Sequence, residues 1–212
     1  MKIALINENS QAGKNELICS TLKKVVEPMG HEVFNYGMYS VDDANQLTYV
    51  QNGILAAILL NSKAADYVIT GCGTGEGAML ACNVFPGVLC GHVEDPSDAF
   101  MFAQINDGNA ISLPFAKGFG WGGELNLQYI FEKLFEGESG KGYPKDRVIA
   151  EQRNKKILDE VKKVTHQDIM SILKNIDQEL LKGAVSGEGF KKYFFENCKN
   201  DEITAYIRKV LA

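Results

Sequence analysis

The chain has 212 residues, of which 45% are hydrophobic and 23% are charged, which is enough to bury the core of one domain of ordinary size. Its formal net charge is −5 and it contains only three arginines, which argues against a large nucleic-acid surface. It lacks a charged leader and any run of 18 apolar residues, so we expect a soluble cytoplasmic protein that does not enter a membrane. The five cysteines form no CxxC pair and the three histidines lie far apart, which predicts neither a zinc site nor a disulfide framework.

Strand and helix patterns alternate through the first two thirds of the chain. Short apolar runs predict five strands, at residues 2–6, 31–37, 67–70, 87–93 and 110–113. Helix-favouring segments between and after them lie at 14–29, 47–63, 78–83, 97–105 and 124–136. This alternation predicts an α/β fold, a parallel sheet with right-handed crossovers and helices on both faces.

The composition changes after about residue 150. From 148 to 182 the sequence is highly charged, with apolar residues at helical spacing, and two shorter helices are predicted at 189–199 and 201–211. We therefore expect a domain of residues 1–150 and a helical C-terminal extension of residues 151–212. The extension is expected to pack on the domain or on a partner subunit.

Residues 66–83 are the most informative stretch. The third strand leads into a loop with glycines at 71, 73, 75 and 77, followed by a helix-favouring segment. Such glycines let backbone N–H groups turn toward a ligand, and the start of the helix adds a partial positive charge. A thiol near a helix N-terminus has a pKa below the free value of about 8.5. The stretch therefore predicts an anion cradle in which Cys72 is a candidate base or nucleophile and Glu76 a second reactive group.

Other polar segments follow the predicted strands. Ligands of parallel α/β sheets bind beyond the carboxyl ends of the strands. We expect the polar segments 7–10, 37–40, 72–77, 94–95 and 106–109 to gather at that edge. His92 lies within the fourth strand and is interpreted as a core histidine with satisfied hydrogen bonds.

A block of spaced residues carries a family resemblance. It consists of Cys72-Gly-Thr-Gly75, Ala81, Asn83, Pro86-Gly87 and Asn106-Asp-x-Asn109, with Gly30-His-Glu-Val33, Gly37 and Tyr49 in register. Over roughly residues 1–150 the chain resembles the ribose-5-phosphate isomerase type B family, which includes galactose-6-phosphate isomerase subunits. The resemblance implies a flavodoxin-like Rossmann domain with a five-stranded sheet, which dimerises and builds each active site from both subunits. It also implies aldose–ketose isomerisation through a cis-enediolate, without a metal or other cofactor.

The resemblance also implies roles for individual residues. Cys72 would be the base that moves a proton between adjacent carbons, and the Thr74 hydroxyl with the loop amides would stabilise the enediolate. Another branch of the family uses a glutamate that falls at Glu76. We assign Cys72 as the base, which leaves Glu76 to orient a hydroxyl or to take over the proton transfer. The implied substrate-binding residues are Glu8, Asn9, Tyr49, Gly73, Gly75, Gly77, Asn106, Asp107, Asn109 and Arg147.

Some of these residues have plainer interpretations. Asn106, Asp107 and Asn109 could form an Asx turn between a helix and a strand. Glu76 could simply favour the start of its helix. Arg147 could belong to a solvated helix face.

The departures from the family suggest the substrate. The family's Asp-His pair after the first strand is Glu8-Asn9 here, and its ring-opening histidine is Ile105. We therefore expect a substrate that is already an open-chain carbonyl. Few phosphate-binding arginines remain, and a carboxylate needs fewer donors than a phosphate dianion. The long chain looks like the branch acting on 4-deoxy-L-threo-5-hexosulose uronate, which derives from the unsaturated uronic acids of glycosaminoglycans. Ribose-5-phosphate and galactose-6-phosphate are the alternative substrates.

Parts of the sequence are also compatible with two other classes of function. Gly73-x-Gly75-x-x-Ala78 satisfies a dinucleotide-binding fingerprint, and Asp95 follows about twenty residues later. Against an oxidoreductase, the loop follows the third strand and Glu76 would occupy the place of a pyrophosphate. A sugar-binding module without catalysis would explain the missing histidine, but it leaves Cys72 and Thr74 unexplained.

Overall fold

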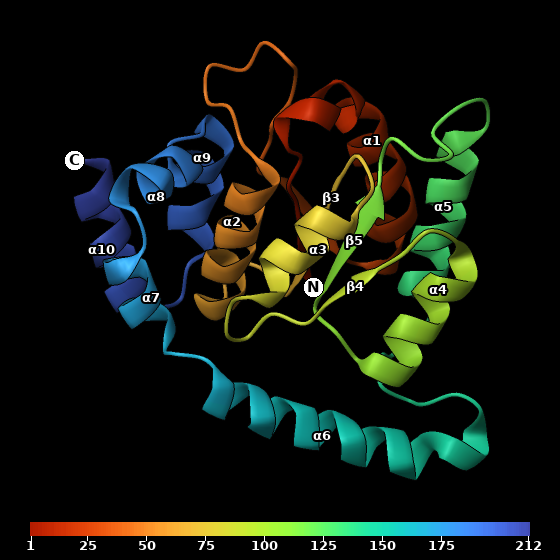
Figure 1. Ribbon diagram of the computed structural model, residues 1–212. Helices are drawn as coiled ribbons and strands as arrows, with labels where there is room; N and C mark the ends of the chain where they lie inside the picture. Colours follow the sequence, from red (N-terminus) through yellow and green to blue (C-terminus); the bar gives the residue numbers. More distant parts are fainter.

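The computed structural model describes all 212 residues and has a five-stranded parallel sheet between layers of helices (Figure 1). The strands are β1 (Lys2–Leu5), β2 (Glu32–Asn35), β3 (Tyr67–Cys72), β4 (Cys90–His92) and β5 (Ala110–Pro114). Their order is β2-β1-β3-β5-β4, with every pair parallel. This order is that of flavodoxin with the last two strands exchanged. The predicted α/β architecture is confirmed.

Helices cover both faces of the sheet. Because neighbouring residues on a strand point to opposite sides, each strand contributes side chains to two apolar clusters. Ile3 and Leu5 pack into one core cluster, whereas Ala4 and Ile6 pack into the other. The helices α1 (Asn15–Val26), α4 (Pro96–Met101) and α5 (Gly123–Leu134) cover the first face, and α2 (Tyr49–Asn61) and α3 (Glu76–Asn83) cover the second. A π-helical turn, Phe102–Asn106, extends α4.

The C-terminal helices form a further layer outside α2 (Figure 1). They are α7 (Ile169–Asn175), α8 (Gln178–Val185), α9 (Glu188–Asn197) and α10 (Asp201–Leu211). Every residue of α2 from Gln51 to Leu60 is buried, because the sheet and α3 cover one side and these helices cover the other. Leu181, Phe190 and Ile203 belong to the same apolar cluster as Ile58 of α2. The extension thus shares the core of the sheet domain.

The helix α6 (Val148–Thr165) crosses the molecule below the sheet and contains no buried residue (Figure 1). Near its C-terminal end the Lys162 Nζ donates to the Asn83 carbonyl at 3.1 Å. The region 148–182, which was predicted to be helical, contains parts of three helices in the structure, α6, α7 and α8. Asp168 and Asp177 break it, because each accepts a backbone hydrogen bond as the N-cap of the next helix.

No helix of the chain combines the length and the apolarity that a membrane crossing requires.

Candidate active site

Cys72 is the last residue of β3 and pairs with Pro114 of β5. The strand order runs in one direction from β1 to β2 and in the other from β3 to β5, so β1 and β3 flank the topological switch point of the sheet. Ligands of open α/β sheets bind beyond the carboxyl ends of strands at such a point. The Cys72 side chain is mostly covered, with the residue 8% exposed.

The loop after Cys72 is held from one side through its carbonyl groups. The carbonyls of residues 72, 73, 74 and 75 accept, in that order, from the Phe115 amide (2.9 Å), the Ala116 amide (2.9 Å), His92 Nε2 (3.0 Å) and the Ser112 hydroxyl. A carbonyl can only accept, so the His92 Nε2 must carry the hydrogen. All four donors come from β4, β5 or the segment just after β5.

The anchored carbonyls fix the direction of the loop amides. In a trans peptide the C=O and the following N–H point in opposite directions. The amides of Gly73, Thr74 and Gly75 therefore point away from β4 and β5, and none of the three donates to an acceptor within the chain. Free N–H groups of fixed orientation beside a thiol are the donors that a developing oxyanion needs.

Two glycines near the thiol lack a side chain for different reasons. Gly75 has φ +80°, and a Cβ there would lie 2.8 Å from the His92 ring. Gly77 has room for a Cβ, which would lie 3.4 Å from the Tyr49 ring and 3.6 Å from the Cys72 Sγ. The absence of a side chain at Gly77 therefore leaves open the space between the thiol and Tyr49, whose ring is half exposed.

The remaining groups on the loop are free to meet a ligand. Thr74 and Glu76 are exposed, and neither side chain makes a hydrogen bond or ion pair within the chain. Glu76 is the first residue of α3, where the helix dipole favours a carboxylate.

Glu8, one of the predicted substrate-binding residues, stabilises the turn after β1. Glu8 is buried and its carboxylate accepts from the Ser10 amide at 2.8 Å and the Ser10 hydroxyl at 2.7 Å. It thereby caps the 3-10 helix Asn9–Lys14. Asn9 is exposed, and its amide bonds the Leu47 carbonyl at 2.7 Å.

Sequence reasoning missed a basic side chain next to the loop. The Lys14 Nζ donates to the Gln11 Oε1 at 2.7 Å and to the Phe115 carbonyl, and it lies 4.6 Å from the centre of the Phe119 ring. Burial lowers the pKa of Lys14. In the sequence Lys14 looks like the polar start of an amphipathic helix, so only its position after the first strand could have indicated this site.

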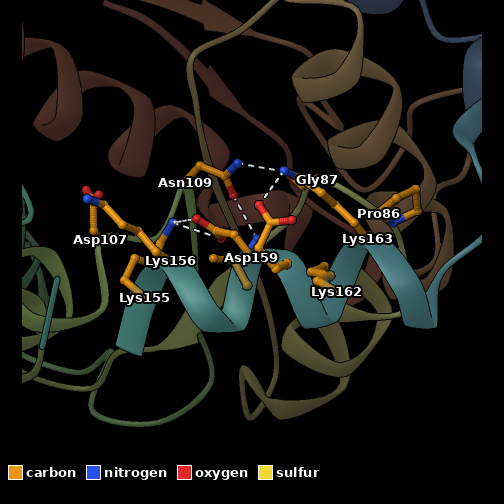
Figure 2. Close-up of a pocket in the computed structure, with 11 residues that line it drawn as sticks. Pro86, Gly87, Asp107, Asn109, Lys155, Lys156, Asp159, Lys162 and Lys163 are labelled. Carbon is orange, nitrogen blue, oxygen red and sulfur yellow. Dashed lines mark hydrogen bonds and ion pairs between the residues drawn. The ribbon is translucent and has the colours of Figure 1, made fainter. Parts of the chain in front are cut away.

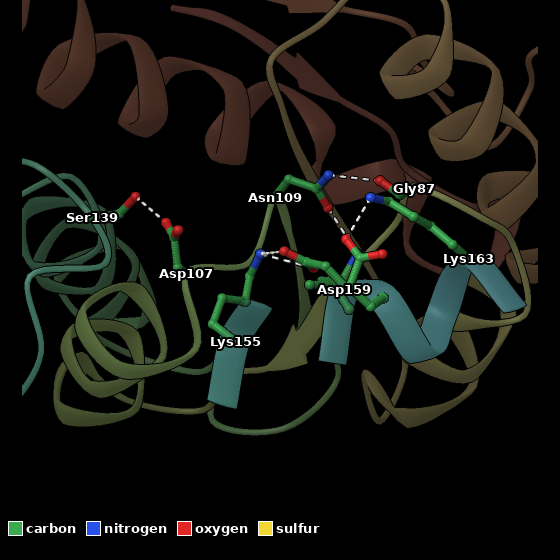
Figure 3. A network of polar contacts seen from close by, with 9 residues as sticks. Gly87, Asp107, Asn109, Ser139, Lys155, Asp159 and Lys163 are labelled. Carbon is green, nitrogen blue, oxygen red and sulfur yellow. Dashed lines mark hydrogen bonds and ion pairs between the residues drawn. The ribbon is translucent and has the colours of Figure 1, made fainter. Parts of the chain in front are cut away.

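The segment 106–109 does not lie at the carboxyl edge of the sheet, and that prediction is wrong. The segment precedes β5, so it lies at the amino edge. Four residue steps separate Val68, which pairs with Ala110, from Cys72, or roughly 13 Å along the strand. The Asn109 side chain donates to the Gly87 carbonyl at 2.7 Å and accepts from the Leu89 amide at 2.8 Å, so it ties two loops together (Figure 3).

The other predicted residues of this edge are also far from the thiol. Asp107 accepts from the Ser139 hydroxyl at 2.6 Å (Figure 3), whereas Asn106 is exposed. Arg147 is exposed and immediately precedes α6. Within one chain the structure therefore brings Cys72, Thr74, Glu76, Asn9 and the loop glycines together at one edge. It leaves Asn106, Asp107, Asn109 and Arg147 outside that group.

A charged cavity of about 360 Å³ lies between α6 and the amino edge (Figure 2). Its lining includes Asp107, Asn109, Lys155, Lys156, Asp159, Glu160, Lys162 and Lys163. Ion pairs neutralise much of the charge of this cavity. The Lys155 Nζ lies 2.7 Å from the Asp159 carboxylate (Figure 3), and the Lys163 Nζ lies 2.7 Å from the Glu160 carboxylate. Cys72 lines neither this cavity nor four others with volumes of about 370 to 570 Å³.

The dinucleotide alternative does not fit the sheet. Asp95 follows β4, and β5 lies between β4 and the strand that carries the glycine loop. Its carboxylate caps α4 by accepting from the Ser97 and Asp98 amides at 2.8 and 3.0 Å. The hydrogen bond from the Ser97 hydroxyl lowers the pKa of Asp95. A ribose ligand would have to follow the strand next to the glycine loop.

Comparison with known families gave two matches. The model described as Ribose/Galactose Isomerase matches residues 3–138, and a second model, described as Ribose-5-phosphate isomerase, matches residues 164–210. A comparison with curated proteins gave no match.

Two solved structures align over the full chain, and a third aligns over part of it. A 4-deoxy-L-threo-5-hexosulose-uronate ketol-isomerase, solved with tartrate, is 64% identical with a TM-score of 0.98, and the match covers 100% of this chain and 99% of that one. A ribose-5-phosphate isomerase from Vibrio parahaemolyticus is 54% identical with a TM-score of 0.97 and the same coverage. The type B ribose 5-phosphate isomerase from Trypanosoma cruzi is 16% identical with a TM-score of 0.64, covers 77% of this chain and 99% of its own, and shares the fold.

These matches name the same family that the block of residues from Cys72 to Asn109 resembles, and they agree with the parallel α/β sheet of the structure. The chain is an isomerase that belongs to the ribose/galactose isomerase family.

Proposed function

We propose that this enzyme interconverts aldose and ketose forms of an open-chain anionic sugar, specifically 4-deoxy-L-threo-5-hexosulose uronate. The observation that carries the proposal is the 64% identity, over the whole chain, to a ketol-isomerase named for this substrate. Ile105 supports it, because it stands where a ring-opening histidine is expected and cannot act as an acid or base. Tartrate, bound in that relative's structure, is also an open-chain hydroxy acid.

The proposed mechanism divides the chemistry between a base and a set of donors. The Cys72 thiolate removes a proton from the carbon beside the carbonyl and returns it to the neighbouring carbon. Charge that develops on the carbonyl oxygen is stabilised by the free amides of residues 73–75 and by the Thr74 hydroxyl. Glu76 orients the substrate hydroxyl that becomes the new carbonyl. Glu8 acts indirectly, because its buried carboxylate shapes the turn that presents Asn9.

Ribose-5-phosphate isomerisation is the second candidate, favoured by the 54% identical relative with that name. The charges near Cys72 favour the uronate. Lys14 is beside the loop, but its ammonium group already serves two acceptors, and the single chain places Arg147 elsewhere. One negative charge is easier to hold with such a donor set than the dianion of a phosphate ester.

We also propose a homodimer in which each active site lies at the subunit interface. The apolar side chains that α6 presents to solvent support it, among them Ile149 and Val164 at 85% and 87% exposure. In a single chain Cys72 lines none of the five cavities of about 360 to 570 Å³, while Asn106, Asp107 and Arg147 lie outside the group at the carboxyl edge. A second copy that docks its amino edge over the loop would supply these side chains and enclose the substrate.

The test is a substrate panel followed by NMR in D₂O. The purified protein is incubated with 4-deoxy-L-threo-5-hexosulose uronate, ribose-5-phosphate and galactose-6-phosphate at equal concentrations. We expect the uronate to isomerise fastest, with solvent deuterium appearing at the carbon that receives the proton. Faster turnover of a sugar phosphate would overturn the substrate assignment. Isomerisation without any deuterium in the product would favour a hydride transfer between the two carbons over the proposed proton transfer.

A further inference from the structure

We infer that His92 is a positioning residue for the oxyanion cradle, because its hydrogen bond to the Thr74 carbonyl aims the Gly75 N–H at the substrate oxygen. The inference rests on the function proposed above for the loop after Cys72. It adds a role for a residue that lies on the edge strand β4, outside the glycine loop and its helix.

The contacts of His92 are concentrated on one peptide unit. Its Nε2 lies 3.0 Å from the Thr74 carbonyl oxygen. The same ring fills the space in which a Cβ of residue 75 would lie, 2.8 Å away. The Glu94 Oε1 lies 3.9 Å from Nε2, beyond hydrogen-bond distance, and Glu94 is paired with Lys117. The histidine therefore contacts both ends of the unit that joins Thr74 to Gly75.

This peptide unit needs an external anchor more than its neighbours do. The two preceding carbonyls are held by backbone amides of residues 115 and 116, which cannot leave without moving the segment after β5. Residue 75 is a glycine with φ +80°, and glycine adopts positive and negative φ with similar ease. Without the His92 hydrogen bond the unit can rotate, and its N–H would then no longer point to the open side of the loop.

The consequence for catalysis differs from that of an ordinary packing residue. A donor that meets the oxygen only as charge develops affects kcat, while substrate binding changes little. Loss of one oxyanion donor typically lowers kcat by about 10²–10³-fold. His92 holds such a donor indirectly, so we expect an effect near the lower end of that range.

Three variants test the inference with the isomerisation assay and thermal unfolding. In His92→Leu the ring nitrogen is lost, and we expect kcat to fall about 100-fold while KM changes less than about threefold. In His92→Gln the amide N–H takes the place of Nε2, and we expect most of kcat to return. His31→Leu is the matched control, because His31 precedes β2 at the opposite edge of the sheet, and it should keep wild-type kcat.

Two results would overturn the inference. One is wild-type kcat in His92→Leu. The other is an equal loss of kcat in His92→Leu and His92→Gln with equal falls in Tm, which would show that the ring only fills space.

A measurement without substrate separates this inference from the proposed function. In ¹H–¹⁵N spectra of the free protein, the Gly75 amide resonance should shift strongly in His92→Leu and return toward its wild-type position in His92→Gln. It should not move in His31→Leu. If the wild-type enzyme isomerises none of the tested sugars, the proposed function fails while the spectra still test the role of His92. An unmoved Gly75 resonance in His92→Leu would refute that role even if the enzyme is active.

Discussion

We expect the replacement of Gly77 by alanine to affect the stability of the protein and the activity of the site in opposite directions. Gly77 lies in the first turn of α3, outside the positive-φ region, and a Cβ would meet the Tyr49 ring and the Cys72 Sγ at ordinary contact distances of 3.4 and 3.6 Å. Alanine is favoured over glycine by about 1 kcal/mol in a helix interior and by less in the first turn. For a protein of this size we therefore expect Tm to stay the same or to rise by about 1–3 °C.

Activity should respond in the opposite direction. The new methyl group would occupy the space between the thiol and the Tyr49 ring, where we place the substrate carbon that loses its proton. Reacting atoms must approach to about 3–3.5 Å, and a displacement of about 1 Å can cost about 100-fold in rate. We expect kcat/KM of Gly77→Ala to fall by about that factor.

The assay compares this variant with two other glycine substitutions. Gly120→Ala should leave both Tm and kcat/KM unchanged, because nothing lies within 4 Å of a Cβ there. Gly71→Ala should lower Tm, because its Cβ would collide with the Leu113 carbonyl and the Phe115 ring. Wild-type kcat/KM in a stable Gly77→Ala enzyme would refute the placement of the substrate between Cys72 and Tyr49.

Other parts of the chain give three further predictions. Leu181→Ala should lower the free energy of unfolding by about 2–5 kcal/mol in denaturant titrations, because Leu181 is fully buried against the core; a negligible loss would mean that the extension is independent. Val164→Lys should shift a dimer toward monomer in sedimentation analysis, whereas Val41→Lys should not. Burial raises the pKa of Tyr39 to about 12, so stability should fall as the pH rises from about 10 to 12, where only the unfolded tyrosine ionises; Tyr39→Phe should flatten that fall.

Much of the fold could be predicted because local signals agreed with the global architecture. The predicted helix 201–211 coincides with α10, and the strand after Asp66 begins at Tyr67 in both. The sequence predicts packing of the C-terminal helices either on the domain or on a partner subunit, and α2 carries the signal that decides between them. A helix that is apolar all round must be covered on every side, and one sheet face cannot do that.

The candidate site was predicted in part. Cys72 and the glycine loop could be placed because a strand followed by glycines and a helix has one common geometry. The segment 106–109 was assigned to the wrong edge, although a segment that precedes a strand must lie at its amino end. His92 and Ser112 could not be identified, because their partners are backbone carbonyls of a loop distant in sequence. Only the three-dimensional structure brings such groups together.

The turnover of Cys72→Ala, measured beside Glu76→Gln with 4-deoxy-L-threo-5-hexosulose uronate, tests the central claim most directly. Removing the thiol takes away the proposed base and little volume, so kcat should fall by orders of magnitude while the thermal unfolding curve stays close to that of the wild type. Glu76→Gln should retain the larger share of activity. An active Cys72→Ala enzyme beside an inactive Glu76→Gln enzyme would contradict the account and assign the proton transfer to Glu76.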